Sequence, residues 1–253
     1  MVAPDNLERA RTVYDAIRNC WVAGGYGLEA HERLSLMTVA AGVREFAFLT
    51  ETNAQCQSAV AQLLGTVGLR ALPCSSAFDI EFEAEGIKAA TAEAYRRVVR
   101  EMSSSNGLGV WSESAASSCC VGMMSLGTAL SYPRCCEMMD LRTKQRDHEL
   151  FLAAIVEEEG DEPAQVERAL RERREYGKAS SDHCHEWSDR FVQTRDRFPF
   201  VLHTACDDCL RPDESPTAML NRQYEGLALS ISTELHLMVR WGARALSYRS
   251  DRP

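Results

Sequence analysis

Lysine is scarce in this sequence: three of the 28 basic residues are lysine, and the other 25 are arginine. Schiff-base chemistry needs a lysine amine, for which arginine is no substitute, and none of the three lysines stands in a recognisable catalytic setting. Familiar catalytic signatures are also missing. The sequence has no Gly-x-Ser-x-Gly elbow, no phosphate-binding loop ending in Gly-Lys-Ser/Thr and no His-Glu-x-x-His. The commonest hydrolase, nucleotide-binding and metalloprotease motifs are therefore excluded.

Long apolar runs are absent as well. No stretch approaches the roughly 18 residues that span a bilayer, and the first residues lack the basic start and apolar stretch of a secretory leader. The formal net charge of −9 gives no general electrostatic reason to bind nucleic acid or an anionic membrane. We therefore expect a soluble, cytoplasmic protein with neither of these partners.

Cysteine, in contrast, is plentiful. Ten cysteines in 253 residues are many for a reducing compartment, yet far fewer than the roughly 8–10% of a disulfide scaffold. A chain of this length buries a core without disulfides, and no export signal is present, so disulfides are a poor explanation. Metal ligation, thiol chemistry and simple burial are the alternatives.

Hydrophobic periodicity predicts an α+β or α/β protein dominated by helices. Two strand-like runs at 44–50 and 69–74 flank an amphipathic helix, which is typical of a βαβ unit, so we expect a small parallel N-terminal sheet. Another short strand is predicted at 109–112. We divide the chain into a small α/β region, 1–112, and a helical, cysteine-rich region, 113–253, that carries the metal site. The two regions can also form one continuous domain.

The second region is predicted to be mainly helical. The pattern favours helices at 141–158 and 162–176, an irregular segment at 178–214, and a last helical region that begins at Ser215-Pro216. The apolar spacing of that last region fits a core helix and a dimer helix equally well, because periodicity does not reveal what covers the apolar stripe. A homo-oligomer or a partner protein is therefore left open.

Two cysteine pairs are the main candidates for chemistry. One is Cys135-Cys136, and the other is Cys206-Asp-Asp-Cys209, a spacing whose turn directs two thiolates at one metal. A thioredoxin-like redox pair is the alternative for the second. That motif should open a helix, whereas five residues separate Cys209 from Ser215, at the start of the predicted helix.

We expect Ser131–Pro133 to form the cap and first turn of a helix that carries Cys135 and Cys136. Unpaired N–H groups and the helix dipole would then favour thiolates at both positions. Neighbouring helical side chains diverge by about 100°, so an iron–sulfur cluster suits such a pair better than a single ion. The alternative is that one of the two thiols packs in the core.

Three histidines accompany the cysteines. His183 and His185 would project from one face of an extended segment, as ligands to a metal or as solvated surface residues. His203, three residues before Cys206, would ligate the metal or serve as acid or base beside it. For His31, His148 and His236 a structural role is the better prediction.

The segment Ser131-Tyr-Pro-Arg-Cys-Cys136, followed by the spacing of His203, Cys206 and Cys209, resembles an uncharacterised group of prokaryotic proteins. That group carries Gly-Tyr-Pro-x-Cys-Cys and then His-x-x-Cys-x-x-Cys, with a short βαβ-like region upstream. Here Ser131 replaces the glycine, and only residues 130–220 share the resemblance. It implies that the two cysteine pairs belong together, and it implies nothing about a substrate.

The favoured hypothesis is a bacterial-type, metal-dependent enzyme of the oxidoreductase class, with an iron–sulfur cluster or iron and a small-molecule substrate. Arg195 or Arg197 would orient an anionic substrate. The first alternative is a structural zinc site in a binding or carrier protein. The second is a thiol enzyme in which Cys206 or Cys135 is the nucleophile and His203 its base.

Overall fold

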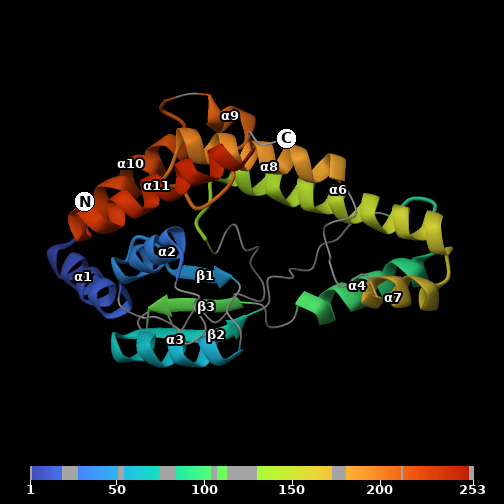
Figure 1. The fold of residues 1–253 in the computed structure, drawn as a ribbon, viewed down its shortest axis with the longest axis horizontal. Helices are drawn as coiled ribbons and strands as arrows, with labels where there is room; N and C mark the ends of the chain where they lie inside the picture. Colours follow the sequence, from blue (N-terminus) through green and yellow to red (C-terminus); the bar gives the residue numbers. More distant parts are fainter. Residues whose placement is uncertain are drawn as a thin grey trace.

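The computed structural model describes residues 2–18, 28–50, 54–74, 84–103, 107–112, 130–172, 181–211 and 213–250. Figure 1 shows a small sheet with its helices at one end of the molecule and the pair α4 and α7 at the other. The long helix α6 (Arg134–Glu159) reaches α7 (Pro163–Glu172) and packs against it. The helix-dominated α+β class is confirmed.

The N-terminal part contains three helices and two strands. In chain order these are α1 (Pro4–Arg18), α2 (Ala30–Ala40), β1 (Phe46–Thr50), α3 (Ala54–Thr66) and β2 (Leu69–Cys74). Helix α1 shows the expected periodicity, because its buried side chains are Ala10, Val13, Tyr14 and Ile17. Both strands lie within the strand-like runs predicted at 44–50 and 69–74.

The sheet corrects the predicted strand pairing. Strand β3 (Gly107–Ser112) lies between β1 and β2 and is antiparallel to both, with Phe48 and Leu72 each opposite Gly109. The two outer strands therefore run in the same direction, as a βαβ crossover requires, but they do not touch. This is a split βαβ arrangement. The prediction of a parallel sheet was wrong because the strand–helix–strand pattern predicts that β1 and β2 run in the same direction but does not predict which strand each of them pairs with.

The remaining elements are helices. Helix α4 (Ala89–Ser103) packs on α7, and Gly160–Glu162 separates α6 from α7 as predicted. The segment at 178–214 was expected to be irregular, but it contains α8 (Ser181–Arg197) and the short α9 (Asp207–Leu210). The last region forms α10 (Pro216–Ile231) and α11 (Thr233–Ser250), and the Ser215 hydroxyl caps α10 by accepting from the N–H of Ala218.

Residues from both parts of the chain share the largest hydrophobic core. It joins α1, α2 and the sheet to Phe200 and to buried side chains of α10 and α11, such as Tyr224 and Val239. A second core joins α4, α6 and α7, and a third, much smaller one surrounds three buried cysteines. Within the residues that the model describes, no helix combines the length and the apolar character needed to cross a membrane.

Candidate metal centre

The first cysteine pair stands at the start of α6. Pro133 is the N-cap and the helix begins at Arg134, so it starts later than the predicted cap and first turn at Ser131–Pro133. The pair thus occupies the second and third positions of the helix. The Tyr132 hydroxyl donates to the carbonyl oxygen of Leu202 at 2.8 Å. This bond ties the start of α6 to the segment that carries the second pair.

The second pair brackets the short helix α9. Cys206 is its N-cap, and the N–H of Cys209 donates to the carbonyl of Cys206 at 3.0 Å, which closes the turn between them. The Ser215 hydroxyl donates to the carbonyl of Cys209 at 2.7 Å. Arg190 of α8 forms an ion pair with Asp207 at 2.8 Å. Bonds from two neighbouring elements therefore hold this turn in place.

The tertiary fold brings the two pairs together across 70 residues of sequence. The Sγ atoms of Cys135 and Cys209 are 3.4 Å apart, and those of Cys136 and Cys206 are 3.7 Å apart. All four Sγ atoms lie within 4.8 Å of one another. Cys135 is exposed and the other three are buried. The four cysteines form a cluster that can bind a metal ion.

Protonation of the cluster differs from the prediction that the helix start favours thiolates at Cys135 and Cys136. Burial and the neighbouring thiols raise the pKa of Cys135 to about 11, and burial also raises the pKa of Cys136. The pKa of Cys209, in contrast, is lowered. Burial alone would raise it, but hydrogen bonds to its sulfur, first from Cys135 and then from Thr217, stabilise the thiolate and outweigh burial. Packing four thiols together thus overrides the helix dipole, since adjacent negative charges repel without a cation.

His203 stands one side chain away from the cluster. Its Nε2 lies 3.0 Å from the hydroxyl of Thr217, and that hydroxyl lies 3.5 Å from Sγ of Cys136. Burial, together with Arg195 and Arg44, lowers the pKa of His203 to about 3, so the ring is neutral near pH 7. No sequence pattern pointed to Thr217, because a threonine in the first turn of a helix carries no metal-site signature.

His183 and His185 lie on α8 instead of in an extended segment. Residues two apart on a helix point in widely different directions, so the argument for one shared face does not hold. Their side chains, and the pair Cys119-Cys120, lie outside the described part of the structure. The three histidines expected to be structural each have a partner: the Pro199 carbonyl for His31, Tyr95 for His148 and Glu225 for His236.

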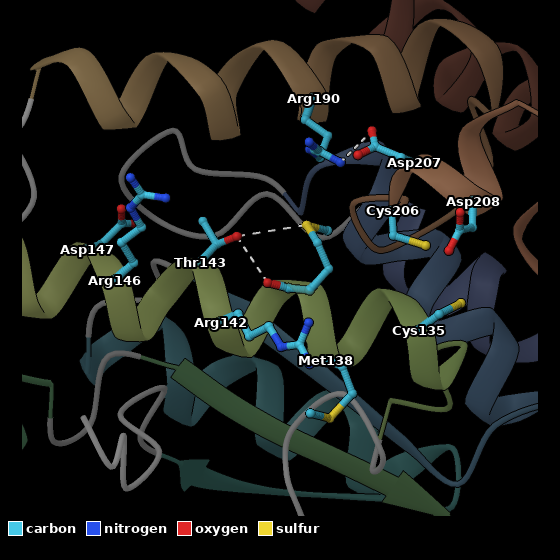
Figure 2. A pocket seen from close by; sticks show the side chains of 11 residues that line it. Cys135, Met138, Arg142, Thr143, Arg146, Asp147, Arg190, Cys206, Asp207 and Asp208 are labelled. Atoms are coloured by element: carbon cyan, nitrogen blue, oxygen red, sulfur yellow. Dashed lines mark hydrogen bonds and ion pairs between the residues drawn. The ribbon is translucent and has the colours of Figure 1, made fainter. Parts of the chain in front are cut away.

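A pocket of about 510 Å³ borders the cluster. Figure 2 shows Cys135 and Cys206 at one end, with side chains of α6 along the floor and the Arg190–Asp207 pair at the rim. The lining mixes arginines, aspartates and the thioethers of Met138 and Met139. Neither His203 nor the arginines predicted to orient a substrate line it: Arg195 bonds the Val201 carbonyl, and Arg197 pairs with Asp213.

No protein-family model, curated protein or solved structure matches this chain. The resemblance to the uncharacterised prokaryotic group therefore stays a prediction. Function is therefore inferred from the geometry of the cluster and of its surroundings.

Proposed function

We propose that Cys135, Cys136, Cys206 and Cys209 together bind a single zinc ion in a closed structural centre. The observation that carries this proposal is the spacing of the sulfurs. A tetrahedral ion with metal–sulfur bonds of about 2.3 Å holds its four sulfurs roughly 3.8 Å apart. Two of the Sγ pairs lie at 3.4 and 3.7 Å, and the whole set lies within 4.8 Å.

The same spacing supports a single ion over a multinuclear cluster. An iron–sulfur cluster places several irons and sulfides between the cysteines, so it requires more widely separated sulfurs than one ion does. Four thiolates in tetrahedral array are the preferred ligand set of zinc, and iron is the competitor for the same cage. Each cysteine would lose its proton and bind the metal as a thiolate, and the charge of the ion would offset the repulsion among the neighbouring thiolates.

The ion would act as a cross-link. Cys135 and Cys136 belong to the first turn of α6, whereas Cys206 and Cys209 belong to a turn held by α8 and by the loop before α10. The small core around the cluster contains few apolar groups beyond Ala205, Met139 and Leu210. Hydrophobic burial there is modest, so metal binding would supply much of the local stability.

Metal analysis of the purified full chain tests the proposal. We expect one equivalent of zinc, a colourless solution, and a visible tetrahedral thiolate spectrum after cobalt replaces zinc. The double variant Cys206→Ser/Cys209→Ser should lose the metal, whereas Cys56→Ser, which removes a thiol outside the four, should retain it. A brown protein with iron and acid-labile sulfide would refute the zinc assignment, and a metal-free protein with the wild-type fold would refute the centre.

A second candidate function is metal-dependent chemistry on a small molecule. One observation favours it: the exposed ligand, Cys135, faces a pocket large enough for a small molecule. The cobalt-substituted protein offers a direct test. A small molecule that reacts or binds at Cys135 should change the cobalt spectrum, and Met138→Trp, which fills the pocket, should abolish the change. If no compound of a broad metabolite panel changes the cobalt spectrum, the second candidate function is refuted and the structural role remains.

A further inference from the structure

Arg44 is a buried cation without a described partner. Its side chain is 4% exposed, and none of its three side-chain nitrogens has a hydrogen-bond partner among the described residues. The contact that the structure gives its guanidinium is the face of the Tyr132 ring, 5.8 Å from Cζ to the ring centre. A guanidinium carries five N–H donors and keeps its charge at any physiological pH, so burying it unpaired is strongly unfavourable.

The position of Arg44 is set by the turn between α2 and β1. Gly42 adopts a φ of +65°, and the N–H groups of Val43 and Arg44 both donate to the carbonyl of Thr38. The left-handed residue reverses the chain at this point. The backbone of Arg44 is therefore fixed, and its side chain is committed to the interior.

Other buried polar atoms without a described hydrogen-bond partner lie in the same region. Arg195 of α8 is 6% exposed and its Nε has no described partner, although its Nη1 donates to the carbonyl of Val201. His203 is 5% exposed, and its Nδ1 has no hydrogen-bond partner within the part of the chain that the structure describes. The ring of His203 lies 4.9 Å from that of Tyr132, on which Arg44 also rests. Arg44 and His203 thus both contact Tyr132, and the charge of Arg195 is near enough to lower the pKa of both Tyr132 and His203.

No described carboxylate forms an ion pair with either arginine. Two acidic groups influence this region through their charge alone: Glu29 raises the pKa of Arg195, and Asp140 raises that of Tyr132. A zinc ion with four thiolates carries a net charge of −2, which would offset part of the positive charge. It supplies no acceptor atom to these N–H groups, since the contacts of the four sulfurs are with one another, with Thr217 and with the N–H of Cys206.

We propose that Arg44 and Arg195 form a buried site for an oxyanion, a phosphate or carboxylate group of a small molecule, beside Tyr132 and His203. Two acceptor oxygens match the planar fork of a guanidinium, and a negative charge compensates the two buried cations. The neutral ring of His203 lines the site without adding charge. This site is distinct from the pocket in Figure 2, and the proposal does not depend on the metal.

The full chain should be titrated with inorganic phosphate and, separately, with citrate, by calorimetry and by thermal unfolding. We expect one of the two anions to bind and to raise the Tm of the wild type. Arg44→Met should weaken that binding at least tenfold and abolish the rise in Tm. Because this variant no longer buries an unpaired cation, its Tm without anion should equal or exceed that of the wild type.

Arg142→Met is the matched control, since it removes an exposed arginine that lines the other pocket. It should leave anion binding unchanged. Arg44→Lys, which keeps the charge but loses the fork, should bind with intermediate affinity. The proposal is overturned if neither anion binds the wild type, if Arg44→Met binds as the wild type does, or if a crystal structure shows a carboxylate of this chain on Arg44. Zinc content is measured in parallel, and it should not change in Arg44→Met.

Discussion

Removing the metal from the proposed cross-link should lower the free energy of unfolding by an amount that depends on how many residues separate the joined cysteines. The cross-link joins Cys136 to Cys206, 70 residues apart, and closing a loop of that length removes unfolded-state entropy worth about 4 kcal/mol. For a chain of this size each kcal/mol corresponds to roughly 2–4 °C in Tm. Removal of the metal should therefore lower the Tm by about 8–16 °C.

Thermal unfolding followed by circular dichroism, with and without a strong chelator, measures this effect. The double variant Cys206→Ser/Cys209→Ser should show the lowered Tm already, and the chelator should not lower it further. Cys56→Ser should behave as the wild type does under both conditions. If the chelator removes the metal but leaves the wild-type Tm unchanged, or lowers the Tm of the double variant equally, the cross-link argument is refuted.

Three further predictions test the packing of the fold. Ser215→Ala removes the cap that accepts from the N–H of Ala218 and should destabilise the fold by about 1–2 kcal/mol in denaturant unfolding; an effect below 0.3 kcal/mol would contradict the cap. Tyr95→Phe removes the hydrogen bond of 2.8 Å between the Tyr95 hydroxyl and the buried Nδ1 of His148 and should cost about 1–3 kcal/mol, measured in the same way. Burial lowers the pKa of His31 to about 3 and that of His148 to about 4, below the unfolded value near 6.5. The unfolded chain therefore takes up protons first, and the free energy of unfolding should fall as the pH drops from about 6.5 towards 4; a flat profile over that range would contradict the burial of these rings.

Local patterns predicted most of the helices and the three strands in the part of the chain that the structure describes. The buried residues of α1 recur at helical spacing, Gly160 ends α6, and Ser215-Pro216 opens α10, because caps and periodicity act within one or two turns of chain. Strand order was beyond such patterns. Strand β3 inserts between β1 and β2 although it follows β2 by more than thirty residues, and only packing of the whole sheet selects that neighbour.

The candidate site likewise combines features that local sequence patterns predicted with features that they did not. Thiol spacing within each pair singled out Cys135, Cys136, Cys206 and Cys209, since metal-binding turns have recognisable sequences. The contribution of Thr217 had no such signal, because its hydroxyl reaches Cys136 across 81 residues of chain. The thiol pKa values were predicted in the wrong direction, because the helix dipole is a local effect whereas burial among other thiols is not.

The sequence by itself determined that this chain is rich in helix, that it carries two thiol pairs with ligand spacing, and where α6 ends and α10 begins. These properties depend on residues only a few positions apart. The tertiary structure alone decided which strands are neighbours, how closely the four sulfurs approach, and that Arg44 is enclosed without a described counter-charge. Each of those depends on desolvation and on contacts between distant segments, which exist only once the chain has folded.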